Sequence, residues 1–174
     1  FETLIHAQYP EHELVFRNLA VAGDEVVKRH RSENFGTPDE WLTKVKADVI
    51  FAFFGFNESF KGEEGLAQFK SDLDQFLKAT LRKNYSGRGA PRVVLFSPIA
   101  NERHQDPNFP DPGPNNARIS LYTAAMSEVA TSNGVQFIDL PANTTARHIR
   151  VEKTSTQGKA QLRVDEAWLG SAHP

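Results

Sequence analysis

The sequence predicts an α/β protein built on a three-layer, doubly wound parallel sheet. Two short runs, Asp48–Phe54 and Arg92–Ser97, are dominated by apolar residues, as expected for strands buried on both faces of a parallel sheet. Between them, apolar residues recur at spacings of three and four over Glu63–Leu81, which indicates an amphipathic helix packed on that sheet. A strand, a helix and a second strand in this order form a right-handed βαβ crossover, the repeating unit of such folds.

The N-terminal part predicts the end of a helix followed by a further strand. Phe1–Ala7 is typical of an amphipathic helix, closed at the boundary Tyr9-Pro10. Leu14–Ala22 is largely apolar and β-branched and stops at the turn dipeptide Gly23-Asp24, so we predict a strand there. Because the chain opens inside a helix and without Met, we expect the natural polypeptide to extend upstream.

The remaining elements continue the alternation of helices and strands, and each is marked by a start or stop signal. They are a helix from the capping residue Thr37 to about Val45, a proline-rich loop over Asn101–Asn116, a helix over Arg118–Ser132 and a strand over Val135–Asp139. After Pro141 no pattern predicts an element. We find no internal repeat and no linker, so residues 1–174 are expected to form a single domain, with 141–174 unassigned.

Composition excludes several classes of function. With 39% apolar and 24% charged residues, the chain fits an ordinary globular domain, and a net charge of −2 is unlike the basic surface of a nucleic-acid-binding protein. The longest apolar run, Val49–Phe56, is far shorter than the roughly 20 residues of a membrane-spanning helix. The absence of cysteine excludes disulfides and thiolate chemistry, and the six histidines lack paired ligand spacing. We therefore expect no nucleic acid, membrane, metal or cofactor as a partner.

Two strand exits carry the candidate functional residues. In a parallel sheet, function concentrates at the carboxyl ends of the strands, and there the predicted strands deliver Gly23 and Asn57. A glycine amide and an asparagine side chain suit the oxyanion of an acyl-transfer intermediate, which such donors stabilise by roughly 2.7 to 4 kcal/mol each. The alternative is that Gly23-Asp24 and Gly55–Asn57 are ordinary turns, which these residue types favour for conformational reasons.

Both segments resemble conserved blocks of one enzyme family. Asn18–Asp24 is similar to the second block of the SGNH (GDSL-type) serine hydrolases, in which a strand ends in a small residue, Gly and Asp. Phe54–Phe60 resembles the third block, usually Gly-x-Asn-Asp, with Glu58 in place of the second acid. The wider phrase Ala47–Phe69 looks like the GDSL-type esterases of large bacterial multidomain proteins.

The resemblance spans roughly residues 1 to 140 and implies more than a fold. It implies a flavodoxin-like sheet, hydrolysis of esters by serine acyl transfer, and a small-molecule or carbohydrate ester as substrate. Gly23 and Asn57 would then be the oxyanion donors, and the chain would be part of a larger multidomain protein.

Two other blocks of this family are absent from the sequence. The Gly-Asp-Ser block should precede the first helix, yet no serine occurs before Ser32. In the Asp-x-x-His block, His acts as the base towards Ser, and Asp orients it. Asp165 is followed at that spacing by Trp168, and neither His148 nor His173 has an acid three residues earlier. We expect a fragment that carries only the oxyanion blocks; the alternative is a degenerate, catalytically inactive homologue that serves as a binding or interaction domain.

Weaker candidates each have a simpler interpretation. His104 could line a pocket, but an exposed loop histidine is expected, and the basic run Lys28–Arg31 is expected to be a solvated loop. Ser97 ends a strand but lacks a Gly-x-Ser-x-Gly elbow, which argues against a nucleophile. The aromatic residues of the strand, Phe51 with Phe53 and Phe54, are expected in the core.

Overall fold

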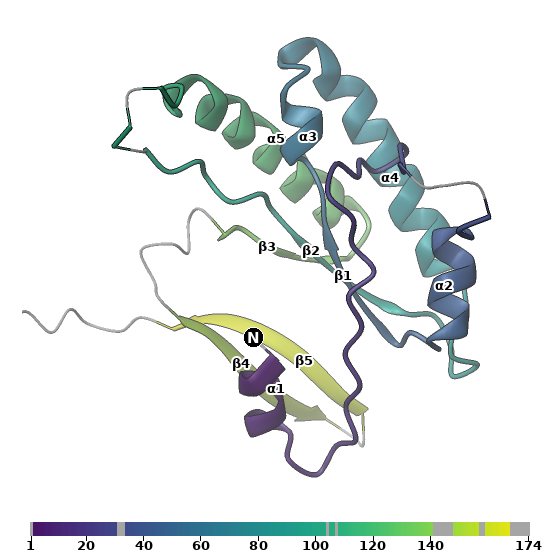
Figure 1. Ribbon diagram of the computed structural model, residues 1–174. Coiled ribbons are helices and arrows are strands. Elements are labelled where there is room, and N and C mark those ends of the chain that lie inside the picture. Colours follow the sequence, from purple (N-terminus) through teal and green to yellow (C-terminus); the bar gives the residue numbers. More distant parts are fainter. Residues whose placement is uncertain are drawn as a thin grey trace, which may run out of the picture. The chain divides into compact units, whose positions relative to one another are not determined.

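The structure is a computed structural model that describes residues 2–30, 34–103, 105–106, 108–140, 148–156 and 159–167. It divides into two compact units, one formed by Leu19–Pro141 and the other by Phe1–Asn18 together with Ala142–Pro174. Figure 1 labels the helices and strands of both units.

The unit Leu19–Pro141 is built on a parallel sheet of three strands in the order β1-β2-β3. Val49 pairs with Arg92, and Val94 pairs with Gln136. Apart from α3 and η1, its elements follow one another as the sequence predicts. They are α2 (Pro38–Lys44), β1 (Val49–Phe53), α3 (Phe56–Ser59), the 3₁₀ helix η1 (Glu63–Gly65), α4 (Leu66–Leu81), β2 (Arg92–Phe96), α5 (Gly113–Ser132) and β3 (Gln136–Ile138).

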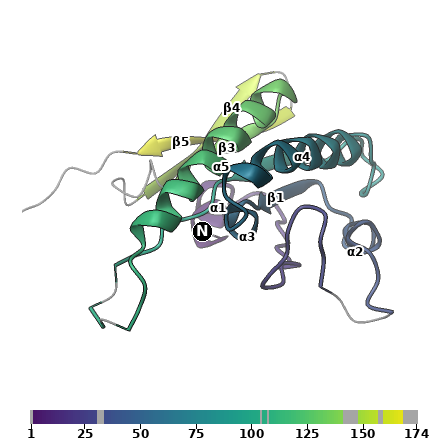
Figure 2. The same ribbon diagram turned by 90° about the horizontal axis from the view of Figure 1, so that it is seen from above.

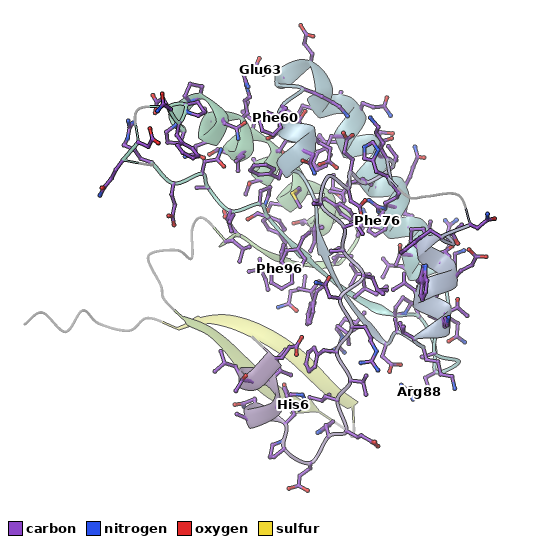
Figure 3. All side chains as sticks on the ribbon, in the orientation of Figure 1. His6, Phe60, Glu63, Phe76, Arg88 and Phe96 are labelled. Carbon is purple, nitrogen blue, oxygen red and sulfur yellow. The ribbon has the colours of Figure 1, made fainter. Side chains whose placement is uncertain are left out.

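The two long helices, α4 and α5, connect consecutive strands and run side by side on one face of the sheet (Figure 1 and Figure 2). This follows from two successive right-handed crossovers that step across the sheet in the same direction. Sheet residues of alternate positions point into this layer, and Phe76 of α4 meets Phe54 edge-on at 5.3 Å between ring centroids (Figure 3). The predicted parallel α/β arrangement is confirmed for these three strands.

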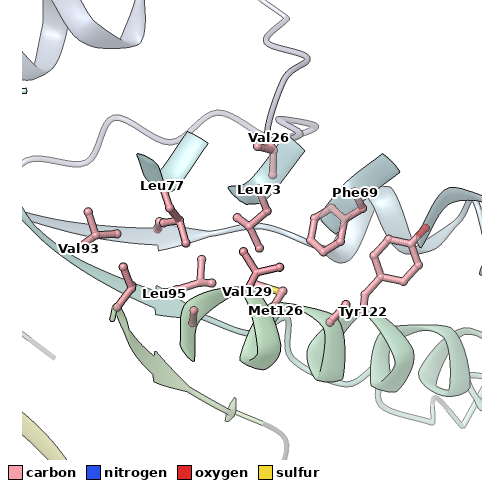
Figure 4. Packing of buried hydrophobic residues seen from close by; sticks show 13 residues of the cluster. Val26, Phe69, Leu73, Leu77, Val93, Leu95, Tyr122, Met126 and Val129 are labelled. Carbon is pink, nitrogen blue, oxygen red and sulfur yellow. The ribbon is translucent and has the colours of Figure 1, made fainter. Parts of the chain in front are cut away.

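The hydrophobic core lies between the sheet and this helix layer (Figure 4). Leu73 and Leu77 of α4 are fully buried, as are Leu95 of β2 and Met126 of α5. Leu73 and Leu77 lie four residues apart, which matches the helical period. This is why the apolar pattern in the sequence predicted that α4 packs on the sheet.

The strand predicted over Leu14–Ala22 is wrong: the structure has no strand in that segment. Val15, Leu19 and Val21 are exposed. An apolar, β-branched composition gives only a propensity for a strand, and here that propensity did not produce one.

Two further boundaries differ from the prediction. Helix α5 begins at Gly113, inside the predicted loop Asn101–Asn116. Pro114 is tolerated at its second position because N–H groups of the first turn have no partner within the helix. The end of the chain, for which we predicted no element, contains β4 (His148–Thr156) and β5 (Lys159–Ala167), which pair antiparallel from His148↔Ala167 to Thr156↔Lys159. In the same unit, α1 (Glu2–Gln8) lies beside β4 and confirms the predicted first helix.

Candidate functional site

The side chain of Asn57 links the two predicted oxyanion loops. Its Nδ2 donates a hydrogen bond of 3.0 Å to the backbone carbonyl oxygen of Asp24, the residue directly after Gly23. Gly23 itself has φ +85, in the left-handed region that favours glycine. This hydrogen bond therefore joins the loop of Gly23 to the segment that follows β1, although the two are more than thirty residues apart in sequence.

A second link comes from the carboxylate of Glu58, which is only 4% exposed. Its Oε1 accepts the backbone N–H of Val26 at 2.8 Å, and its Oε2 accepts the backbone N–H of Gly55 at 3.0 Å. Buried carboxylates are tolerated when their oxygens are hydrogen-bonded, and here each oxygen has one partner.

A third link is the ion pair between Lys61 Nζ and Glu25 Oε2, at 2.6 Å. The hydrogen bond to Glu25 raises the pKa of the Lys61 ammonium above its ordinary value, although burial opposes this. The consecutive residues Asp24, Glu25 and Val26 are thus each tied to the segment Asn57–Lys61. We call these three interactions the loop clamp.

Gly55 shapes the start of the segment that carries Asn57. Its φ is +97, and a Cβ at this position would lie 2.9 Å from Met126 Sδ and 3.3 Å from Pro98 Cγ. Only glycine fits where the chain leaves β1, turns, and enters the single turn of α3. The glycine of the predicted block therefore has a steric reason as well as a conformational one.

Two serines near the same strand ends are buried. Ser97 Oγ accepts the N–H of Leu140 at 2.8 Å and donates to the carbonyl of Pro98 at 3.2 Å. Ser59 Oγ donates to the carbonyl of Phe56 at 2.6 Å and is also inaccessible to solvent. Neither hydroxyl has the exposure that attack on a substrate requires.

The basic run is largely solvated, as expected. Lys28 and His30 are exposed, and the guanidinium of Arg29 lies over the ring of Phe54, 4.7 Å from its centroid. The His30 ring approaches Gly23, with Cδ2 3.9 Å from the position a Cβ would take, a proximity that sequence spacing did not reveal. Arg31 and His104 lie outside the described residues.

The expectation of a fully buried aromatic strand holds only in part. Phe54 packs against the core cluster, whereas Phe53 is 57% exposed. Ala52 faces the core, so Phe51 and Phe53 point to the opposite face of the sheet. Both rings contact the ring of Phe96 there, and the ring of Phe53 stacks on it with 4.6 Å between centroids. Helices α4 and α5 cover the face of the sheet that carries Ala52, and burial of that face does not imply burial of side chains on the opposite face.

Two classes of feature are not found within the described ranges. No group of three or more His, Cys, Asp or Glu side chains there is arranged to hold a metal ion. No helix in the same part of the chain combines the length and apolar character needed to cross a bilayer.

Three solved structures are similar to this chain. A mutant acetyl-xylooligosaccharide esterase from Geobacillus is 19% identical with a TM-score of 0.54, covering 81% of this chain and 61% of that one. A carbohydrate acetylesterase from Sinorhizobium meliloti has a TM-score of 0.46 and an aryl esterase from M. smegmatis one of 0.48, and both are 14% identical. These two cover 66% and 68% of this chain and 58% and 60% of their own.

This chain therefore spans about three fifths of the length of the structures it matches. No protein of curated function matches it. The likeness to the Geobacillus structure shows the fold, which is the flavodoxin-like α/β fold of the SGNH hydrolases.

The family is shown by a match of sequence pattern rather than by any one structure. The model of the GDSL-like lipases and acylhydrolases matches residues 1–173, almost the whole chain. The resemblance seen in the blocks around Gly23 and Asn57 is thereby confirmed at the level of the family. The chain belongs to the GDSL-like lipase/acylhydrolase family.

Proposed function

We propose that this chain is the oxyanion-binding part of an ester hydrolase that works by serine acyl transfer. The Gly23 N–H and the Asn57 side-chain amide are the two donors. The observation that carries the proposal is the hydrogen bond from Asn57 Nδ2 to the carbonyl of Asp24, which holds both donors on adjoining loops. An amide NH₂ has two hydrogens, so this bond leaves one for an oxyanion.

The chemistry follows from where charge develops. When a serine hydroxyl attacks an ester carbonyl, the carbonyl oxygen becomes an anion, and donors fixed beforehand stabilise it without reorganising. The loop clamp supports such fixation, because Asn57 and the loop of Gly23 are joined by contacts that do not involve substrate. We place the nucleophile and its base outside these 174 residues, since neither block occurs in the sequence.

We further propose acyl or acetyl esters as the substrate class, on a small molecule or a carbohydrate. The support is family membership, together with the fold shared with an acetyl-xylooligosaccharide esterase. The second candidate function is an inactive binding domain on the same scaffold, which the two missing blocks favour. The flanking coding sequence separates the two: a Gly-Asp-Ser upstream and an Asp-x-x-His downstream support the enzyme.

The activity test uses the protein in which these blocks are present. There, Asn57→Ala should lower kcat by about 10² to 10³ while leaving KM comparatively unchanged, because the donor acts mainly on the transition state. Gln75→Ala is the matched control, since it removes an exposed amide from α4. The 174-residue chain should hydrolyse no ester above background. An unchanged kcat in Asn57→Ala would refute the assigned role.

A further inference from the structure

The carboxylate of Glu58 is the only part of the loop clamp that is both charged and buried. It spans the two loops directly: Oε1 takes the N–H of Val26, three residues after Gly23, and Oε2 takes the N–H of Gly55, two residues before Asn57. A single planar group thereby fixes one backbone atom on each loop.

We propose that Glu58 is a positioning residue that sets the separation and orientation of the Gly23 amide and the Asn57 side chain. This inference rests on the proposed oxyanion role of these two residues. Glu58 acts through them and does not itself touch the substrate. Its effect is geometric, because its two hydrogen bonds join the backbone of the Gly23 loop to the backbone that follows β1.

The site requires two acceptors. Val26 and Gly55 each present an N–H, and an ionised carboxylate offers an oxygen to both. A glutamine at position 58 has one carbonyl oxygen, so its NH₂ group would face one of the two donors. Hydrogen bonds to an ionised acceptor are also about twice as strong as neutral ones.

The site also requires the length of a glutamate. An aspartate at position 58 would draw the carboxylate back by one carbon–carbon bond, about 1.5 Å. It could still reach the nearby N–H of Gly55, whereas the bond to Val26, now 2.8 Å, would be lost. The acid that is usual in this family block is therefore not equivalent to Glu58 in this chain.

The other two links of the clamp do not replace Glu58. Lys61 is largely exposed, and exposed ion pairs contribute little because water and salt screen them. The hydrogen bond from Asn57 to Asp24 involves the side chain that Glu58 is proposed to position, so this bond forms only when the two loops already lie together.

The experiment is nuclear magnetic resonance on the ¹⁵N-labelled 174-residue chain, with the variants Glu58→Asp and Glu58→Gln. In Glu58→Asp, amide exchange at Val26 should become about tenfold faster or more, and in Glu58→Gln the same should occur at either Val26 or Gly55. In both variants the Gly23 amide and the Asn57 side-chain NH₂ signals should shift. Glu58→Asp should keep the protection of Gly55. Amides of the buried helix layer, such as Leu73, should keep their exchange rates.

Glu63→Gln is the matched control, because Glu63 is an exposed acid on the connection that follows α3 (Figure 3). It should change none of these signals. A merely structural role for Glu58 predicts a different pattern, in which all amides exchange faster together and the signals of Gly23 and Asn57 are not singled out.

Two results would overturn the proposal: faster exchange at Val26 with unchanged Gly23 and Asn57 signals, or uniform acceleration throughout the chain. If both variants fail to fold, amide exchange in the unsubstituted chain tests the proposal. The Val26 and Gly55 amides should both be protected from exchange, and an unprotected Val26 amide would refute the bridge. These spectra do not depend on activity. The positioning role can thus fail while Asn57→Ala still lowers kcat, and the reverse can also occur.

Discussion

The sulfur of Met126 lies next to the position that a side chain on Gly55 would occupy, because a Cβ on Gly55 would be 2.9 Å from Sδ. Met126 is fully buried within α5, so it has little room to withdraw. The helix layer thus restricts which residue can stand between β1 and α3, where the turn to Asn57 begins.

Gly55→Ala should destabilise the chain by about 2 kcal/mol or more, because it combines left-handed strain with overpacking against Met126. Urea denaturation measures the loss. The control is Gly134→Ala, where φ is +64 but nothing lies within 4 Å of the added Cβ, so only about 1 kcal/mol of backbone strain is expected. Equal losses at the two sites would show that Met126 does not matter.

Ser97→Ala should lower the free energy of unfolding by about 1 kcal/mol, since the N–H of Leu140 loses its acceptor. In the protein that carries the missing blocks, the same change should leave ester turnover intact. A fluorophosphonate probe, followed by peptide mass spectrometry, should label neither Ser97 nor Ser59. An adduct on either would reveal a nucleophile that their burial argues against.

Leu73→Ala should cost about 2 to 5 kcal/mol, because Leu73 is fully buried between α4 and the sheet and its loss leaves a cavity. Leu121→Ala, on α5 but 38% exposed, is the matched leucine and should cost much less. Thermal and urea unfolding of the two variants give the comparison. Similar losses would mean that the core is not where the structure has it.

The carboxyl group of Asp39 should titrate below the ordinary range of aspartate. Its pKa is lowered chiefly by the hydrogen bond from Lys83 and next by that from Tyr85, against a smaller opposing effect of burial. A pKa that is lower in the folded than in the unfolded chain stabilises the fold above the unfolded value, and this contribution disappears as pH falls through the folded value.

Carbon-detected titration of Asp39 tests this directly. Lys83→Ala should raise the midpoint, Tyr85→Phe should raise it less, and neither should restore the unfolded value alone. In Asp39→Asn, the melting temperature should fall less between neutral and strongly acidic pH than in the unsubstituted chain. A midpoint at the ordinary value would contradict the hydrogen bonds.

The sequence alone predicted those strands and helices whose apolar residues form a continuous run or recur with the helical period. The apolar runs around Val49–Phe53 and Arg92–Phe96 became strands, and the helical period over Glu63–Leu81 became η1 and α4. Leu14–Ala22 carried a similar signal and formed no strand, because an apolar, β-branched composition is only a propensity. The start of α5 was missed since prolines were interpreted as loop rather than as first-turn residues.

The candidate site was predictable only to the level of its sheet edge. The rule of carboxyl ends holds for Asn57, which follows β1, but no strand ends at Gly23. The structure nevertheless joins the two loops through Asp24. The bridge from Glu58 to Val26 depends on a contact across 32 residues, and no single-sequence pattern encodes such a partner. The sequence could show that an acid follows Asn57, but not what that acid binds.

Strand β1 also affects how the chain behaves once it unfolds. Its residues, Val49–Phe53, include no charge and no proline. Short segments of this composition pair with identical segments of other molecules when they are exposed in an unfolded chain. Aggregation of the unfolded 174-residue chain is therefore expected to begin at β1 and to increase with protein concentration.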